Sequence, residues 1–239
     1  SFDSPIPHPV SGPLNAADWC VWVVHHSPLA ERRAHLEVEM KASGLDAWSP
    51  VWLLEHDRES IPIRVREEAI RPPLNAGHLS VILKHLEVFR RAAESGAPFH
   101  LVLEDDVVID REWQARLARM VAALPENWEI LYVGDGCGLH VPWWCRLLAG
   151  HGTRTAGVYF RGWQSTWWGG GGMSRCAAGY VIRPESARRF LASRQTKPPY
   201  EVTIDWLMNR VGAELRMRAY WAEPPLFRQG TFLSWTQQE

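Results

Sequence analysis

The sequence predicts an α/β fold in which a mainly parallel sheet is covered by helices on both faces. Short apolar runs typical of buried strands alternate along the chain with segments whose apolar residues recur at helical spacing. Parallel strands buried on both faces are nearly continuous apolar runs, and segments 19–25 and 128–134 have this character. With 239 residues and no internal repeat or low-complexity linker, the chain is expected to form a single domain over 17–239, behind an extended or disordered lead-in at 1–16.

Six segments carry the apolar runs of strands and are bounded by turn residues. They span 19–25, 48–54, 99–103, 128–134, 177–182 and 215–221, and an irregular tail is expected after the last. Gly96 and Pro98 precede the third strand. The charged stretch 55–71 supports no secure element, and 135–176 is expected to be a long loop-like insert with four consecutive glycines, Gly169 to Gly172.

Helices are predicted between these strands at 28–43, 75–95, 111–124, 184–193 and 203–212. Pro28 suits the first position of a helix, and Gly44 suits a C-terminal cap. Asn75 and Thr203 are expected to be N-caps, because a short side-chain oxygen accepts hydrogen bonds from the first unpaired amides of a helix. Asp110 is expected to cap the third helix in the same way.

The strand at 99–103 runs directly into three acidic residues, Glu104, Asp105 and Asp106. Adjacent carboxylates repel one another in a partly dehydrated cleft, so a positive partner is expected there, and a divalent cation is the simplest one. Ligands of open α/β sheets bind at the carboxyl ends of the strands, where this run lies. Taken alone, a solvated turn explains the run equally well.

The composition argues against some classes of partner. Hydrophobic residues make up 46% of the chain and charged residues 22%, as in a globular protein. The 26 basic and 27 acidic side chains give a net charge of −1, so the chain lacks the excess positive charge that binds nucleic acid or an anionic membrane. No run approaches the roughly 18 apolar residues of a membrane span, and no signal peptide is visible, so a cytoplasmic location is expected. The chain starts without Met, which leaves a removed leader or anchor open.

The four cysteines, Cys20, Cys137, Cys145 and Cys176, form no CxxC pair. They are too few to indicate a disulfide scaffold, so free thiols in a reducing compartment are expected. A disulfide between 137 and 145, or between 145 and 176, is the alternative.

Several segments between about residues 19 and 235 match a known order of motifs. They are the first strand with Ser27-Pro28-Leu29-Ala30-Glu31-Arg32-Arg33, the stretch Leu74 to His85, the strand and acidic run Phe99 to Asp106, the strand Glu129 to Gly134, the segment Gly179 to Leu191, Asp205, and Pro224 to Gln229. On these segments the chain resembles glycosyltransferase family 25, which includes bacterial lipooligosaccharide galactosyltransferases and collagen galactosyltransferases. Lys84 stands where the family has Ser, and His78 where it has an acidic residue, which indicates a distant branch.

The resemblance implies a GT-A fold, which is a Rossmann-type architecture, with a UDP-sugar donor and Mn²⁺ or Mg²⁺. A sugar nucleotide leaves as a diphosphate, and a metal ion held by carboxylates stabilises the charge that develops on it. Glu104 and Asp106 are expected to point to the same side of an extended segment and to hold the metal together, with Asp106 as the direct ligand. Asp105 is then expected to face the ribose or a basic partner.

Asp205 matches an acidic position of the family and is the predicted general base. An inverting transfer needs a carboxylate that takes the proton of the acceptor hydroxyl. Glu201, about one helical turn earlier, is the substitute candidate. The alternative for Asp205 is a helix-start residue that stabilises the helix macrodipole.

Other side chains are candidates for donor binding. Arg32 and Arg33 suit a diphosphate because guanidinium groups match phosphate oxygens, although surface ion pairs with nearby glutamates explain them equally well. His25 and His26 follow the first strand, where a base or ribose would lie. His85 belongs to the family's pattern, but its apolar neighbours are typical of a hydrogen-bonded core histidine.

Tryptophan is unusually frequent, with 14 residues, and five of them fall within the insert. These five are Trp143, Trp144, Trp163, Trp167 and Trp168. Aromatic faces stack on sugar rings, and mobile loops close over bound donors. We therefore predict ligand contacts for Trp167 and Trp168, which precede the glycines, while the other tryptophans are expected to fill a hydrophobic subcore.

The sequence thus predicts a metal-dependent glycosyltransferase that moves a hexose, galactose from UDP-galactose, onto a saccharide or other hydroxyl acceptor with inversion. One alternative is a non-catalytic protein that binds carbohydrate or nucleotide sugar on a transferase scaffold. The other is a metal-dependent nucleotidyltransferase. No Walker-type glycine-lysine loop supports phosphoryl transfer from ATP. Neither nucleic-acid binding nor a transmembrane segment is expected.

Overall fold

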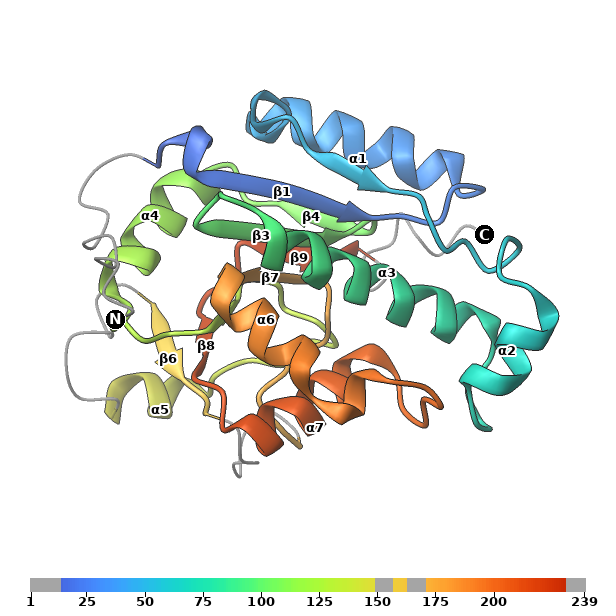
Figure 1. Cartoon of the computed structure of the whole chain (residues 1–239). Helices are drawn as coiled ribbons and strands as arrows, with labels where there is room; N and C mark the ends of the chain where they lie inside the picture. Colours follow the sequence, from blue (N-terminus) through green and yellow to red (C-terminus); the bar gives the residue numbers. More distant parts are fainter. Residues whose placement is uncertain (1–13, 149–156, 163–170, 231–239) are drawn as a thin grey trace.

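A seven-stranded mixed sheet forms the centre of the computed structural model, which describes residues 14–148, 157–162 and 171–230 (Figure 1). The sheet strands are β1 (Trp19–Val24), β2 (Val51–Leu53), β3 (Phe99–Glu104), β5 (Ile130–Tyr132), β6 (Val158–Phe160), β7 (Gly179–Ile182) and β8 (Ala219–Ala222). Their order is β2-β1-β3-β7-β5-β8-β6. A separate two-stranded sheet pairs β4 (Val107–Ile109) with β9 (Phe227–Gln229).

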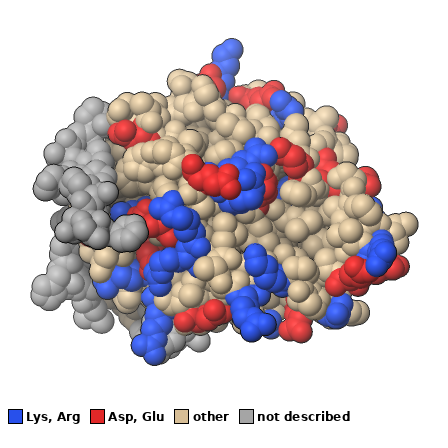
Figure 2. Space-filling model, in the orientation of Figure 1, with Lys and Arg blue, Asp and Glu red and all other residues tan. Residues whose placement is uncertain are grey.

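Helices connect most of these strands. They are α1 (Ala30–Ser43), α2 (Ile63–Ala69), α3 (Ala76–Glu94), α4 (Trp113–Ala123), α5 (Trp143–Leu148), α6 (Pro184–Ala192) and α7 (Ile204–Leu215), with short 3₁₀ helices η1 (Ala16–Asp18), η2 (Leu45–Trp48) and η3 (Arg194–Thr196). Among the described residues, none of the helices is long and apolar enough to cross a membrane. Acidic and basic side chains are interspersed on the face drawn in Figure 2, in line with the near-zero net charge.

Five strands of the large sheet run in the same direction. β1 is parallel to β2 and β3, and β5 is parallel to β8. β7 is antiparallel to both β3 and β5, and β6 is antiparallel to β8. The predicted α/β class with a mostly parallel sheet is therefore confirmed, and two reversed strands complete the sheet.

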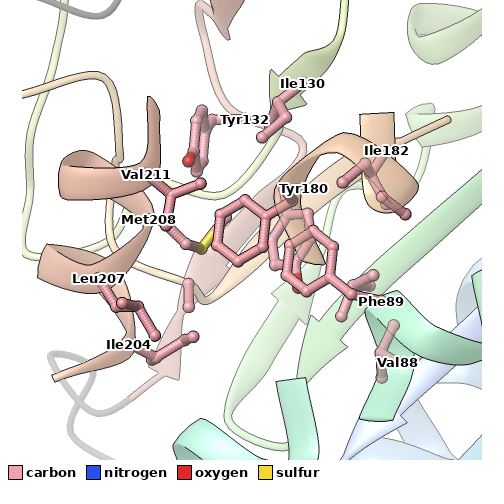
Figure 3. Packing of buried hydrophobic residues seen from close by; sticks show 14 of the residues in the cluster. Val88, Phe89, Ile130, Tyr132, Tyr180, Ile182, Ile204, Leu207, Met208 and Val211 are labelled. Carbon is pink, nitrogen blue, oxygen red and sulfur yellow. The ribbon is translucent and has the colours of Figure 1, made fainter. Parts of the chain in front are cut away.

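The two faces of the sheet carry separate apolar cores. Along β3, Val102 packs with α3, α6 and α7, whereas Leu101 and Leu103 pack on the opposite face with α1 and α4. This alternation follows from the two-residue period of a strand. Figure 3 shows the first core, in which Tyr180 of β7 lies between Phe89 of α3 and Met208 of α7. Helices thus cover both faces, as the sequence predicts.

Local capping explains where two helices begin or end. Asn75 caps α3 by accepting from the backbone N–H groups of Gly77 and His78, while the Nδ1 atom of His78 accepts from the backbone N–H of Asn75. This reciprocal capping box confirms the predicted N-cap. α1 ends at Gly44, whose φ of +74° is the left-handed conformation that favours glycine.

Several predicted boundaries were wrong. α1 starts at Ala30 and not at Pro28, and α4 starts at Trp113 although Asp110 accepts from the backbone N–H of Glu112. α7 continues past Gly212 to Leu215, because Arg216 adopts the left-handed conformation that ends it.

Elements were also missed where the sequence shows no strong period. α2 lies in the stretch 55–71, and α5 and β6 lie within the predicted loop-like insert 135–176. β4 and β9 lie far apart in the chain and meet only in the folded protein. Neither segment taken alone therefore shows the sequence pattern of a strand. Of the predicted lead-in, residues 1–13 lie outside the described part of the chain, and residue 16 begins η1.

We expect Phe89→Ala to lower the free energy of unfolding by about 3–5 kcal/mol. Phe89 is fully buried, with its ring stacked on Phe190 at 4.3 Å between centroids. The matched control is Val38→Ala on α1, because Val38 is 65% exposed and should change stability by no more than about 0.5 kcal/mol. Urea unfolding measures both. Equal losses in the two variants would contradict the assignment of Phe89 to the core.

Candidate functional site

A pocket of about 270 Å³ lies at the carboxyl ends of β1 and β3, bordered by the start of α1 and the first turns of α3. Its acidic lining residues are Glu104, Asp105 and Asp106, and its basic ones are His25, His26, Arg32, Arg58 and Lys84. The acidic run therefore lies where the sequence predicts it, at the end of a central strand. Glu104 is the last residue of β3, however, and Asp105 and Asp106 form the turn to β4, so the run is not extended throughout as the sequence predicts.

Asp105 is held by two basic side chains. The Nδ1 atom of His25 lies 2.7 Å from Oδ2 of Asp105, and Nη1 of Arg32 donates to Oδ1 at 3.5 Å. An ionised carboxylate only accepts hydrogen bonds, so His25 donates to it from Nδ1. Nε2 is then the ring nitrogen that is left for another hydrogen bond. Nε2 is buried without a hydrogen-bond partner among the described residues. The predicted basic partners of Asp105 are thus His25 and Arg32, both from the list of candidate donor-binding residues.

Glu104 lies toward α3. The Nε2 atom of His85 is 3.5 Å from Oε1 of Glu104, and Nδ1 of His85 is 2.8 Å from the hydroxyl of Tyr180. Burial raises the pKa of Tyr180 well above its usual value, so its hydroxyl stays protonated and donates to Nδ1. The proton of a neutral His85 then lies on Nε2, facing Glu104. His85 is both a fully buried core residue and a neighbour of the acidic turn.

Asp106 contacts the C-terminal strand of the small sheet. Its backbone carbonyl accepts from the N–H of Gly230, and its Oδ2 accepts from Nε2 of Gln229 at 3.4 Å. Gln229 also donates its backbone N–H to Oδ1 of Asp135 at 2.7 Å. Pairing of β4 with β9 brings this end of the chain to the acidic turn. Gln229 closes the last segment that resembles the family, yet only the structure reveals its contact with Asp106.

Asp205 lies at the start of α7 and accepts from the hydroxyl of Thr203. Thr203 is the N-cap residue by position, but its side chain makes no capping hydrogen bond. Burial is the main cause that raises the pKa of Cys176, and the charges of Cys137, Asp205 and Glu104 add to it. Asp205 and Glu104 therefore both act electrostatically on the same thiol.

Among the described residues, Arg33 and Glu201 do not line the pocket. Arg33 donates to Glu37 at 2.9 Å, and its guanidinium lies over the ring of Trp52. Glu201 is exposed and pairs with Arg210 at 3.4 Å. Trp167 and Trp168 lie outside the described residues.

The cysteines are free among the described residues, as the sequence predicts, but the neighbouring pair is a different one from the two alternatives. The sulfur atoms of Cys137 and Cys176 are 3.3 Å apart. The loop after β5 and the segment before β7 meet there, which sequence spacing alone does not show.

Lys84, one of the two residues that depart from the pattern of motifs described above, is almost fully buried. Its Nζ lies 2.9 Å from Oδ1 of Asp57 and donates to the carbonyl of Glu55 at 2.7 Å. Burial opposes the ionisation of Asp57, but hydrogen bonds from Ser27 and Lys84 outweigh it and lower the pKa of Asp57 from 3.8 to about 2. This buried pair holds the loop 54–60 against α3 beside the pocket. Sequence analysis missed Asp57 because its stretch shows no periodic signal.

The donor set suits a hard divalent ion that a substrate helps to bind. Among the described residues, no three His, Cys, Asp or Glu side chains converge as a preformed metal cage. Mg²⁺ sites commonly use one or two carboxylates completed by substrate phosphates and water, and Mn²⁺ prefers the same oxygen ligands. Asp106 and Glu104 both line the pocket and could each supply one carboxylate to such an ion.

Comparisons with known proteins assign no family to this chain. A scan against protein-family models gave no match, and a search of curated proteins gave none. The functional proposal therefore depends on the pocket and its side chains.

The Lys84–Asp57 pair predicts a pH dependence of stability. A carboxyl whose pKa is lower in the folded state stabilises the fold above its unfolded pKa, and this contribution is lost as the pH falls from about 4 to about 2. With the pKa of Asp57 at about 2, the loss is on the order of 2 kcal/mol. Urea unfolding across this pH range measures it.

The double variant Asp57→Asn/Lys84→Met is the control, because it removes both charges and should lack this component. Asp57→Asn alone leaves the ammonium of Lys84 buried without its carboxylate, and it should be less stable than the double variant at neutral pH. A double variant that loses stability as steeply as the parent below pH 4 would contradict the assignment.

Proposed function

We propose that the protein is a metal-dependent glycosyltransferase of the GT-A class, which transfers a hexose from UDP-hexose, with UDP-galactose as the expected donor, to a hydroxyl acceptor with inversion. The observation that carries the proposal is the pocket at the carboxyl ends of β1 and β3, where the acidic turn 104–106 meets basic side chains. Ligand sites of open α/β sheets lie at this edge. The resemblance of the same segments to glycosyltransferase family 25 supports the assignment.

On the donor side, the acidic turn and its partners receive the nucleotide diphosphate. Asp106 and Glu104 would hold Mn²⁺ or Mg²⁺, which when bound supplies positive charge that stabilises the leaving diphosphate. Arg32 lines the pocket 3.5 Å from Asp105, so its guanidinium is placed both to neutralise that carboxylate and to bind phosphate oxygens. His25 offers Nε2 as an acceptor for an N–H or O–H of the nucleoside.

On the acceptor side, Asp205 acts as the general base. The acceptor oxygen forms the new bond to the anomeric carbon as the bond from that carbon to the diphosphate breaks, and the hydroxyl proton passes to Asp205. The hydroxyl of Thr203 donates to Oδ1 of Asp205 and so fixes the orientation of the carboxylate. The second oxygen of the carboxylate remains for the acceptor.

A non-catalytic protein that binds nucleotide sugar is the competing proposal, and a nucleotidyltransferase is another. Both use the acidic turn, but neither requires a carboxylate oriented at the start of α7. A panel of nucleotide sugars with and without Mn²⁺, assayed for thermal shift and for release of UDP, separates the transferase from the non-catalytic binding protein. UDP release with hexose transfer supports the proposal, whereas binding without turnover favours the first alternative.

We expect Asp106→Asn to abolish Mn²⁺-dependent binding of UDP while the fold is retained. Replacing the carboxylate by an amide removes the charge that a divalent ion requires and keeps the shape of the side chain. Isothermal titration with UDP and Mn²⁺ measures the effect, and circular dichroism checks the fold. Asp46→Asn, an exposed position on η2, is the control and should bind as the parent does. Unchanged metal-dependent binding in Asp106→Asn would refute this role.

We expect Asp205→Asn to lower kcat by about 10²–10⁴-fold with little change in the affinity for UDP-hexose. A base acts on the acceptor's proton in the transition state and contributes little to holding the donor. Glu201→Gln is the matched control, since Glu201 is exposed and paired with Arg210. Turnover within a few-fold of the parent would make Asp205 a helix-start residue only. A collapse of donor affinity would place Asp205 in the donor pocket instead.

A further inference from the structure

A second pocket, of about 220 Å³, lies between the first turn of α3 and the start of α7. Its lining residues are Asn75, Gly77, His78, Val81, Thr203 and Ile204. Gly77 and Val81 also line the pocket of the acidic turn, so the two hollows are neighbours along α3. The second pocket therefore extends the candidate donor site toward α7.

The capping box fixes the hydrogen-bonding roles of the α3 wall. Oδ1 of Asn75 accepts from the backbone N–H groups of Gly77 and His78, which leaves the side-chain amide of Asn75 as a donor. Nδ1 of His78 accepts from the backbone N–H of Asn75 at 3.1 Å, so a neutral His78 carries its proton on Nε2. Neither of these two donors has a partner among the described residues. This wall thus offers two N–H groups.

The α7 wall has the opposite role and lies next to the proposed base. The hydroxyl of Thr203 donates its hydrogen bond to Oδ1 of Asp205, so toward a ligand it can only accept. Ile204 and Val81 add apolar surface to the pocket. A ligand in this pocket is therefore one hydrogen-bonded side chain away from Asp205.

These roles identify a class of ligand. The described lining residues include no Asp, Glu, Lys or Arg, and the imidazole of His78 acts as a neutral donor. The pocket therefore offers no opposite charge to a charged ligand. Alternating donors and acceptors beside apolar surface suit a neutral sugar ring, whose hydroxyls both donate and accept. The volume lies below the roughly 300–1,000 Å³ typical of drug-sized ligands, which favours a single ring.

We propose that this pocket is the acceptor subsite and binds a neutral pyranose ring beside the hydrogen-bonded pair Thr203 and Asp205. The inference deepens the proposed glycosyltransferase activity and rests on it. It also gives a role to His78, one of the positions that depart from the family's pattern. The family has an acidic side chain at this position, which accepts hydrogen bonds, whereas His78 can donate one from Nε2.

The test uses two nearly isosteric variants of the full chain. In His78→Gln the side-chain oxygen can still accept from the N-cap N–H while the amide donates to a ligand. In His78→Glu the carboxylate also maintains the capping box but offers no donor. The pair therefore separates the capping role from the ligand-binding role.

Saturation-transfer NMR with a panel of neutral methyl hexosides measures binding without any turnover. We expect the parent and His78→Gln to bind the same hexoside within about threefold, and His78→Glu to bind it about tenfold more weakly, the size of one lost hydrogen bond. Affinity for UDP with Mn²⁺ should be equal in all three proteins. Equal hexoside binding by the Gln and Glu variants, or no binding by the parent, would overturn the acceptor subsite.

Failure of the proposed function has a different signature. A parent that neither binds nor turns over UDP-hexose refutes the glycosyltransferase proposal, and with it the role of the pocket as an acceptor subsite. A parent that transfers hexose while all three proteins show the same KM for the acceptor refutes the subsite alone.

Discussion

Three adjacent carboxylates can occupy a pocket at the end of a buried strand only where other groups compensate each of them. The turn between β3 and β4 meets this constraint by directing its side chains to different elements. Glu104 lies near His85 of α3, and Asp105 is bound by His25 and Arg32 from the N-terminal part of the chain. Asp106 contacts the returning strand β9 through its backbone and its side chain. The first strand, two helices and the last strand are thereby joined at a single turn.

The reversed strand β7 brings the second half of the chain to this turn. Because β7 is antiparallel to β3, it begins at Gly179 beside the end of β3, where the carbonyl of Ala178 accepts from the N–H of Glu104. The approach is close: a Cβ atom at Gly134 would lie 2.8 Å from the backbone nitrogen of Gly179. Gly172 is closer still to Asn209, where a Cβ atom would lie 2.3 Å from the side chain, so the segment before β7 also packs tightly on α7. The start of α7, with Asp205, is placed by this packing.

Much of the fold was predictable because its signals are local. The apolar run of β3, the cap at Asn75 and the end of α1 at Gly44 each depend on a few neighbouring residues. The acidic run at the end of β3 was found for the same reason. The pairing of β4 with β9, and that of Lys84 with Asp57, join segments without periodic pattern, so their partners are decided by tertiary contacts. These contacts include part of the lining of the candidate site.

By itself, the sequence determined the α/β class, the position of the acidic run at the end of a central strand, and the candidate residues His25, Arg32 and Asp205. Only the tertiary structure decided that β7 runs antiparallel, that Asp105 and Asp106 form a turn, and that Thr203 donates to Asp205. The physical reason is the range of the interactions. Propensity and hydrophobic period act over one turn or one strand, whereas strand direction and side-chain pairing depend on how distant segments pack to bury apolar surface and to compensate buried charge.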